Sequence, residues 1–204
     1  MESTIEELKS DVERWESGPE LVVLDTNVFL HATEIFNELD LTRLVGNSTW
    51  RLLVPMTVVD ELDDLKRSTN KTDRGESVRS RARRTLRALE DAAADGADET
   101  PMSATGSTVE VVRDPPGHVR LPRPDDEIVD RAVAIQQIAG RQVSLITSDT
   151  GMMLRARPLG LRALRYYTEA DRDQVTCMRE RSADPRTIHG FLRNQKIMTG
   201  ETVI

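Results

Sequence analysis

Short apolar runs alternate with amphipathic stretches along the chain. Residues 21–24 and 143–147 are nearly continuous apolar segments, which is typical of strands buried on both faces of a parallel sheet. Shorter segments at 51–54, 108–112 and 161–166 predict three further strands. We therefore expect an α/β fold with a parallel sheet of about five strands and helices on both faces.

Between these strands, apolar residues recur at the spacing of amphipathic helices. The longer predicted helices cover 3–16, 27–36, 57–68, 76–94 and 125–140. Shorter ones are expected near 39–45, 151–157 and 173–181, and the acidic stretch 95–107 and the proline-rich stretch 114–124 are expected to be irregular. Thr26 and Thr57 are candidate N-caps, the latter in a capping box with Asp60.

Charge is distributed unevenly over the 204 residues. The formal net charge of -7 argues by itself against a nucleic-acid-binding protein. However, residues 1–50 hold 3 Lys and Arg against 11 Asp and Glu, whereas residues 151–204 hold 10 against 6. A locally basic surface therefore remains compatible with the composition.

The remaining composition excludes several classes of protein. The single cysteine, Cys177, rules out an intrachain disulfide framework, and the three histidines lack zinc-ligand spacing. No apolar stretch is long enough to span a membrane, and the acidic start of the chain does not resemble a signal peptide. We expect a soluble, cytoplasmic protein without a membrane partner.

Four acidic residues stand at matching places in the predicted topology. Asp25 and Asp149 each follow a buried strand, while Glu61 and Asp125 lie at the start of helices. Because the carboxyl ends of parallel strands share one sheet edge, these side chains should gather there. Their mutual repulsion favours protonation or the binding of divalent cations, and Mg²⁺ and Mn²⁺ prefer oxygen ligands.

Each of these acids also has a simpler interpretation. Asp25 or Thr26 could merely cap a helix, and Asp60 and Glu61 could interact with a helix dipole. Asp125 and its neighbour Asp126 could likewise only cap their helix. Four acids at equivalent positions favour a metal site more than any one of them alone.

Arginines are concentrated on the predicted helix 76–94. They are Arg79, Arg81, Arg83, Arg84 and Arg87. A solvated charged face is one interpretation, and a helix that contacts phosphates is the other. Arg79, Arg83 and Arg87 are the candidates for RNA binding.

The order of the motifs resembles the PIN domain, a family of nucleases. The matching segments are VLDTNVFL, VPMTVVDELDDLK, DDEIVDRA and LITSDTGMMLRARPLGL, and the resemblance extends over about residues 21–167. It implies metal-dependent hydrolysis of RNA that leaves a 5′-phosphate and a 3′-hydroxyl. It also implies that Asp25, Glu61, Asp125 and Asp149 form the acidic metal-binding and catalytic quartet.

The same resemblance assigns roles to the neighbouring residues. Asp25, Glu61 and Asp149 would hold a first metal, and Asp125 would complete that site or hold a second ion. Asp126 could share or replace the role of Asp125. Thr26 and Asn27 belong to the family's first motif and Thr147 to its fourth, and support for the site is expected from them rather than direct chemistry.

The chain departs from the compact toxin members of the family. It has an N-terminal helix (1–18), a nuclease-like domain (19–168) and a C-terminal extension (169–204), as in larger bacterial PIN proteins fused to a PhoH-like ATPase, but it contains no GxxxxGK[ST] motif. The expected function is a Mg²⁺- or Mn²⁺-dependent endoribonuclease. The alternatives are a toxin held by an antitoxin-like protein partner and a non-catalytic RNA-binding scaffold, and a homodimer is possible by analogy.

Overall fold

The structure of the chain is a computed structural model that describes residues 2–47, 49–72, 75–93, 100–102 and 106–168, with side chains from residue 9 onward. The chain divides into two units, Met1–Tyr166 and Tyr167–Ile204. The first unit contains every helix and strand described below. The helix predicted at 173–181 lies outside the described residues.

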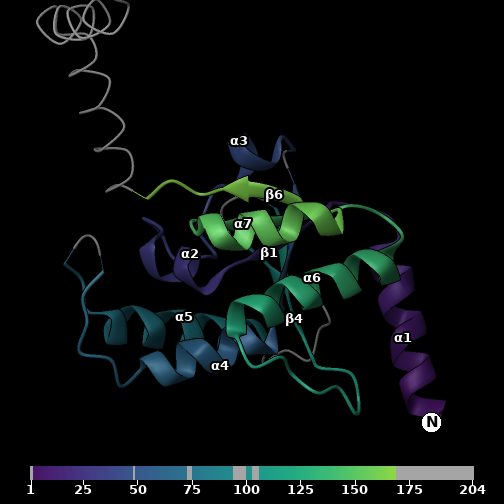
Figure 1. Cartoon of the computed structure of the whole chain (residues 1–204), viewed down its shortest axis with the longest axis horizontal. Coiled ribbons are helices and arrows are strands. Elements are labelled where there is room, and N and C mark those ends of the chain that lie inside the picture. Colours follow the sequence, from purple (N-terminus) through teal and green to yellow (C-terminus); the bar gives the residue numbers. More distant parts are fainter. Residues whose placement is uncertain (1, 48, 73–74, 94–99, 103–105, 169–204) are drawn as a thin grey trace, which may run out of the picture. The chain divides into compact units, whose positions relative to one another are not determined.

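A six-stranded sheet forms the centre of this unit (Figure 1). Its strands are β1 (Glu20–Leu24), β2 (Trp50–Pro55), β3 (Thr100–Pro101), β4 (Thr108–Val112), β5 (Val143–Thr147) and β6 (Arg162–Arg165). The order across the sheet is β3-β4-β2-β1-β5-β6, and all neighbours are parallel except β3 and β4. The predicted mainly parallel sheet is thus confirmed, with one short strand more than expected.

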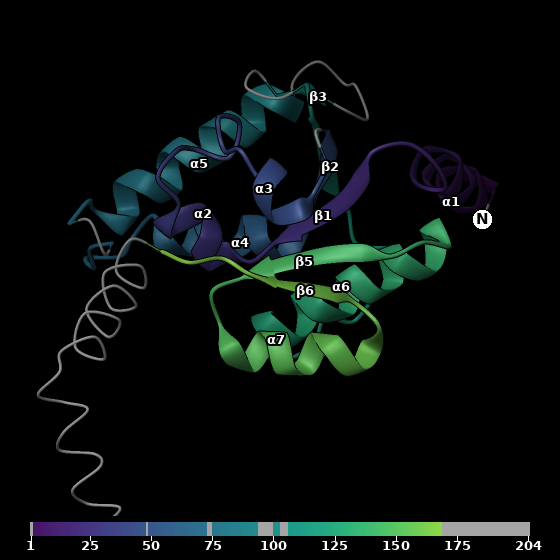
Figure 2. The ribbon, with the colours of Figure 1, turned by 90° about the horizontal axis from the view of Figure 1, so that it is seen from above.

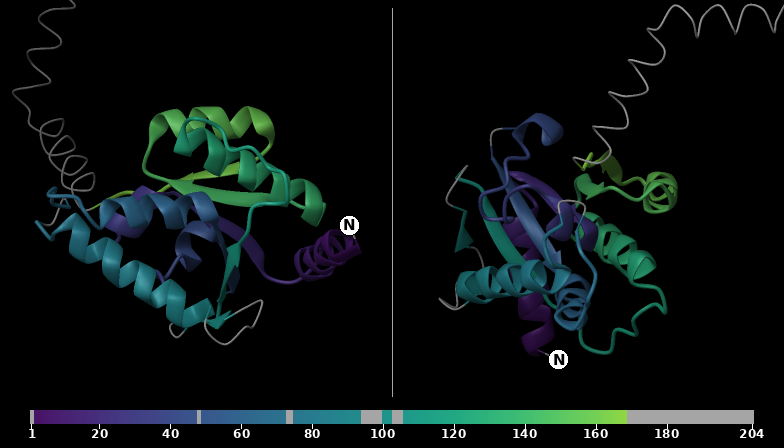
Figure 3. Two further views of the ribbon diagram at one scale, coloured as in Figure 1. Left: turned by 90° about the horizontal axis from the view of Figure 1, so that it is seen from below. Right: turned by 90° about the vertical axis from the view of Figure 1, so that its left-hand side faces the viewer.

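Helices cover both faces of the sheet. The described helices are α1 (Glu2–Trp15), α2 (Thr26–His31), α3 (Thr42–Val45), α4 (Met56–Leu65), α5 (Val78–Ala93), α6 (Pro124–Ala139), α7 (Thr150–Ala156) and the 3₁₀ helix η1 (Arg157–Leu159). Figures 2 and 3 show α6 and α7 on one face and α4 and α5 on the other. Because both faces are covered, β2 and β5 are buried at every position, as their apolar sequences predict.

The first helix is fixed to the sheet by polar contacts as well as by packing. The indole Nε1 of Trp15 donates to Glu110 on β4 at 3.0 Å, and Arg14 forms an ion pair with the same carboxylate. Burial of Glu110 raises the pKa of its carboxyl group, while these two donors lower it. The amphipathic pattern at the start of the chain therefore reflects docking of α1 onto its own domain.

Several local predictions were wrong. Thr26 and Thr57 are not N-caps, because helices α2 and α4 begin one residue earlier than expected, with Asp25 and Pro55 in the cap positions. The hydroxyl of Thr26 instead donates to Glu61, and Thr57 is buried inside the first turn of α4. The helix expected at 27–36 ends at His31, and part of the stretch expected to be a loop, 95–107, forms β3.

No helix among the described residues combines the length and the apolar character needed to cross a membrane.

Candidate metal centre

The acidic residues predicted from the sequence lie at the carboxyl edge of the sheet. Asp25 directly follows β1, and its backbone N–H continues the sheet by donating to the carbonyl of Ile146 on β5 at 3.0 Å. Asp149 lies two residues after β5 and begins α7. Glu61 and Asp125 come from the first two turns of α4 and the first turn of α6.

Asp25 is the most buried of these acids, with 2% of its surface exposed. Its Oδ2 accepts a hydrogen bond from the hydroxyl of Thr147 at 2.8 Å. Burial raises the pKa of Asp25, and the negative charges of Asp125 and Asp149 raise it further, whereas the Thr147 hydroxyl and the Asn27 backbone N–H lower it. The net shift is upward, as expected for a carboxylate held among like charges. Asp25 also occupies the N-cap position of α2, but its side chain forms no capping hydrogen bond there.

Glu61 is half-buried and faces Asp25. Its Oε2 accepts from the Thr26 hydroxyl at 2.5 Å, which fixes the carboxylate against the start of α2. Burial raises the pKa of Glu61, as do the charges of Asp25 and Asp125, against the opposing effect of the Thr26 hydrogen bond. A bound cation would stabilise the ionised forms of both Asp25 and Glu61, because its positive charge would offset the cost of burying them and their mutual repulsion.

Asp149 has a structural role in addition to the predicted one. Its Oδ1 accepts from the backbone N–H of Met152 at 2.6 Å, which caps α7, and its own N–H donates to the Thr147 hydroxyl at 2.9 Å. The same hydroxyl therefore links Asp149 to Asp25. This arrangement holds the two strand-end acids in a fixed relation across β1 and β5.

Asp125 and Asp126 lie side by side at the N-terminus of α6, and both form ion pairs with Arg155 of α7. The distances are 3.0 Å from Nη2 to Asp125 Oδ2 and 3.0 Å from Nε to Asp126 Oδ1. Neither residue is the N-cap of α6, because Arg123 takes that position and Pro124 begins the helix. The capping interpretation of these two acids is therefore wrong.

A pocket of about 350 Å³ opens beside the acids. Asp25, Glu61 and Asp125 line it together with Thr26 and Asn27. The rest of its lining consists of residues that sequence reasoning missed, namely Leu30, His31, Leu65, Asn70, Lys71 and Val78. The backbone of Lys71 forms an isolated β-bridge with that of Ser77. No sequence motif predicts this bridge.

The predicted RNA-binding arginines do not line this pocket. Arg79, Arg83 and Arg87 are exposed along one side of α5, as their spacing of four residues implies. Arg81 on the same helix is buried, and its guanidinium donates to the backbone carbonyls of Phe29, Ala32 and Glu34. One arginine of the charged helix is thus part of the core, and the pattern alone did not distinguish it.

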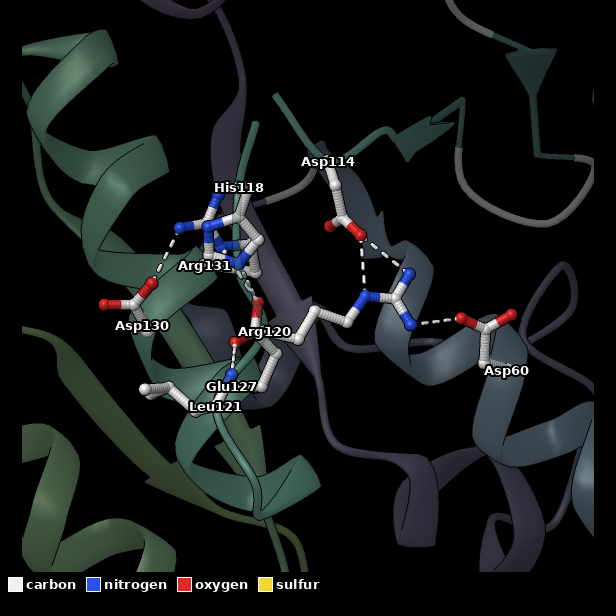
Figure 4. A network of polar contacts seen from close by, with 8 residues as sticks. All are labelled: Asp60, Asp114, His118, Arg120, Leu121, Glu127, Asp130 and Arg131. Atoms are coloured by element: carbon white, nitrogen blue, oxygen red, sulfur yellow. Dashed lines mark hydrogen bonds and ion pairs between the residues drawn. The ribbon is translucent and has the colours of Figure 1, made fainter. Parts of the chain in front are cut away.

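A second polar cluster surrounds His118 and Glu127 (Figure 4). Among the described residues, Asp114, His118 and Glu127 form the group whose potential ligand atoms all lie within 4.8 Å of one another. Glu127 is buried and already accepts from His118 and the Leu121 backbone, at 2.7 Å each, and Asp114 is bound to Arg120. These contacts occupy both oxygens of Glu127, whereas Asp114 Oδ1 is buried without a hydrogen-bond partner. The cluster is therefore a structural network with one unsatisfied carboxylate oxygen.

This network fastens the loop 113–123 to two helices. Arg120 bridges Asp114 in the loop and Asp60 on α4, next to Glu61 (Figure 4). At the other end, Glu127 on α6 is two residues from Asp125. The sequence analysis did not single out Glu127, because an acid in the first turn of a helix is unremarkable until its partners are known.

The residues at the strand ends fit a divalent metal ion. They supply carboxylate oxygens from four elements, and burial together with like charges disfavours the ionised forms of Asp25 and Glu61 when no cation is bound. Among the described residues, no three of these strand-end acids place their ligand atoms within 4.8 Å of one another, so an ion held by Asp25, Glu61 and Asp149 would have to draw these side chains together.

Comparison with known proteins gives a family match. The family model described as "PIN domain" matches residues 22–167. No curated protein shows a significant match to the sequence. A solved domain of a functionally unknown protein from Methanocaldococcus jannaschii DSM 2661 is 19% identical, with a TM-score of 0.46 over 74% of this chain and 91% of that one. Structural similarity at this TM-score and sequence identity supports no functional argument. The assignment to a family therefore rests on the family model.

Proposed function

The chain belongs to the PIN domain family, whose members are generally metal-dependent nucleases, and we propose that this protein is a Mg²⁺- or Mn²⁺-dependent endoribonuclease. The observation that carries the proposal is the buried Asp25, whose pKa is raised among the acids of the strand ends. A carboxylate in that environment gains from a bound cation. Phosphodiester hydrolysis is the reaction that such a cluster supports best.

In this proposal Asp25, Glu61 and Asp149 are the main ligands, and Asp125 completes the cluster with Asp126. A divalent ion, when bound, lowers the pKa of water and neutralises charge on the phosphate. Thr147 and Thr26 orient the carboxylates of Asp25 and Glu61 through their hydroxyl groups. Orientation by these hydroxyls keeps the acceptor oxygens directed toward the pocket.

Nucleic acid would reach the acids through the pocket beside them. Lys71 and Asn70 line the same pocket as Asp25 and supply a positive charge and an amide, and Leu30, Leu65 and Val78 supply apolar surface. Arg79, Arg83 and Arg87 would add phosphate contacts outside the pocket, offsetting the net charge of -7. This combination suits a flexible single strand, whose bases are free to pack against apolar side chains.

The test is incubation of the purified protein with labelled single-stranded RNA in Mn²⁺, Mg²⁺ or EDTA. Asp25→Asn should abolish metal-dependent cleavage while the circular dichroism spectrum is retained. Asp91→Asn, the same change at an exposed position on α5, should leave cleavage intact. Full activity of the Asp25→Asn protein would refute the assignment.

The alternatives derived from the sequence stay predictions. Growth arrest on expression, relieved by a small protein partner, would favour the toxin. RNA binding without cleavage in any metal would favour the scaffold. A homodimer would be seen by sedimentation of the purified chain.

A further inference from the structure

A basic side chain lies within the acidic cluster. Arg155 approaches from α7 and pairs with Asp125 through Nη2 and with Asp126 through Nε. The Nε of Arg155 and the Oδ1 of Asp126 are both buried, and neither has a hydrogen-bond partner, so their contact is an ion pair without hydrogen-bond geometry. The Nη2 of Arg155 donates a hydrogen bond to Asp125, which fixes the position of the guanidinium beside both carboxylates.

The same guanidinium also approaches the strand-end side of the cluster. A Cβ placed on Gly151 would lie 3.0 Å from Asp149 Oδ1 and 3.5 Å from Arg155 Nη1. Arg155 Nη1 and Asp149 Oδ1 therefore both border the space beside Gly151. Arg155 forms its ion pairs with the acids of α6.

Among the described residues, no other lysine or arginine forms an ion pair with Asp25, Glu61, Asp125, Asp126 or Asp149. Five acids in one cluster ordinarily require more than one positive charge from bound ions. An arginine is always protonated and supplies part of that charge permanently. It also engages the two carboxylates that a second metal ion would need.

We propose that the Arg155 guanidinium replaces a second divalent cation, so that the acidic cluster of this chain binds one metal ion, at Asp25, Glu61 and Asp149. This inference rests on the proposed function, because it assumes that the cluster binds metal. A second ion at Asp125 and Asp126 would have to displace Arg155 or bind a short distance from its positive charge, and both are unfavourable. Arg155 would then serve as the fixed positive group facing the phosphate on that side of the site.

The experiment is equilibrium dialysis of Mn²⁺ against the full chain, which counts bound ions without any measurement of cleavage. The wild-type protein should bind one ion. Arg155→Ala should bind two, because removal of the guanidinium frees Asp125 and Asp126. Arg157→Ala, a matched change at an exposed arginine two residues further on, should bind one.

Two further variants separate the charge of Arg155 from its contribution to folding. Arg155→Lys keeps the positive charge and should bind one ion, and the double variant Arg155→Ala with Asp126→Asn should return from two ions to one. If Arg155→Ala does not fold, as judged by circular dichroism, Arg155→Gln replaces it with the same expected result.

Three outcomes would overturn the inference, and they are distinguishable. Two ions bound to the wild-type protein, or one ion bound to every variant, would refute the role of Arg155 and leave the metal site in place. No ion bound to the wild-type protein would refute the proposed metal site itself, and the inference with it.

Discussion

The hydroxyl of Thr147 lies 2.8 Å from the Oδ2 of Asp25 and connects the ends of two neighbouring parallel strands. The same oxygen accepts from the backbone N–H of Asp149 at 2.9 Å. A threonine at the end of β5 therefore orders both strand-end acids through one atom. Thr147 is fully buried, so no water molecule can replace its hydroxyl group.

Thr147→Val should weaken metal binding. Loss of the hydroxyl removes a hydrogen bond that lowers the pKa of Asp25, so that pKa rises and protons compete with the metal up to a higher pH. It also leaves the Asp149 N–H without its partner, at a cost of about 1–3 kcal/mol of stability. Mn²⁺ affinity measured across a pH series tests this, with Thr147→Ser as the control that keeps the hydroxyl. Equal affinities for the valine and serine variants would contradict it.

Asp25→Asn should stabilise the metal-free protein at neutral pH. The pKa of Asp25 in the folded chain lies above its ordinary value of 3.8, so folding is favoured by this group at low pH. That contribution is lost as the pH rises through the raised pKa, and the asparagine variant does not lose it. We expect the melting temperature at neutral pH to rise by about 2–4 °C, which corresponds to roughly 1 kcal/mol in a domain of this size. The difference from the wild type should vanish toward acid pH, and a lower melting temperature of the variant at neutral pH would contradict the prediction.

Addition of metal should reverse that order of stability. A ligand that binds the folded state at one hundred times its Kd stabilises it by about 2.7 kcal/mol. Wild-type protein should therefore gain stability in Mn²⁺ and lose it again in EDTA, whereas Asp25→Asn should respond little to either. Thermal melts of both proteins, with and without Mn²⁺, provide the measurement. A comparable gain in both would place the ion elsewhere in the chain.

Arg81 and Arg83 should respond in opposite ways to substitution. Arg81→Met leaves two buried backbone carbonyls and a third, partly buried one without the guanidinium donor and should cost about 3 kcal/mol or more. Arg83→Ala changes an exposed side chain, and the free energy of unfolding should stay within about 0.5 kcal/mol of the wild type. Urea denaturation of the two variants makes the comparison. Similar stability losses would show that the buried contacts of Arg81 contribute little.

Combined replacement of Arg79, Arg83 and Arg87 by alanine should weaken binding to RNA and reduce its salt dependence. Each lost phosphate contact lowers the slope of log affinity against log salt by about 0.7 for a single strand. Three contacts therefore change the slope by about 2 units. Binding is measured in EDTA to prevent cleavage, with Arg84→Ala, at an exposed arginine paired with Glu76, as the control. An unchanged slope would favour the alternative interpretation, in which these arginines form only a solvated charged face.

The strands could be predicted closely because burial on both faces leaves a local record in the sequence. The bounds predicted for β4 and β5 coincide with those observed, and β1 differs by one residue. The positions of Asp25 and Asp149 followed from those strands together with the rule that parallel strands end at one edge. The family model supports the fold and the general activity, and the roles of the individual acids stay predictions.

The errors concern side chains whose partners are distant in sequence. Thr26 is a residue type common at N-caps, but its hydroxyl donates a hydrogen bond to Glu61 from a different helix. Arg81 has the same residue type as its exposed neighbours and differs only in meeting carbonyls of the segment after β1. Glu127 resembles any acid in a first helical turn until His118 and Leu121 are placed beside it. None of these pairings is encoded in a local pattern.

The loop 113–123 has a consequence for the kinetics of ion uptake. It is tied to α4 through an exposed ion pair with Asp60 and to α6 through the buried Glu127, so the helices that carry Glu61 and Asp125 cannot separate without breaking one of these contacts. The backbone around the acids is therefore set in advance of any ion. We expect the rate of metal association to be governed by how fast the ion sheds its hydration water, with no slow opening or closing of the protein before it.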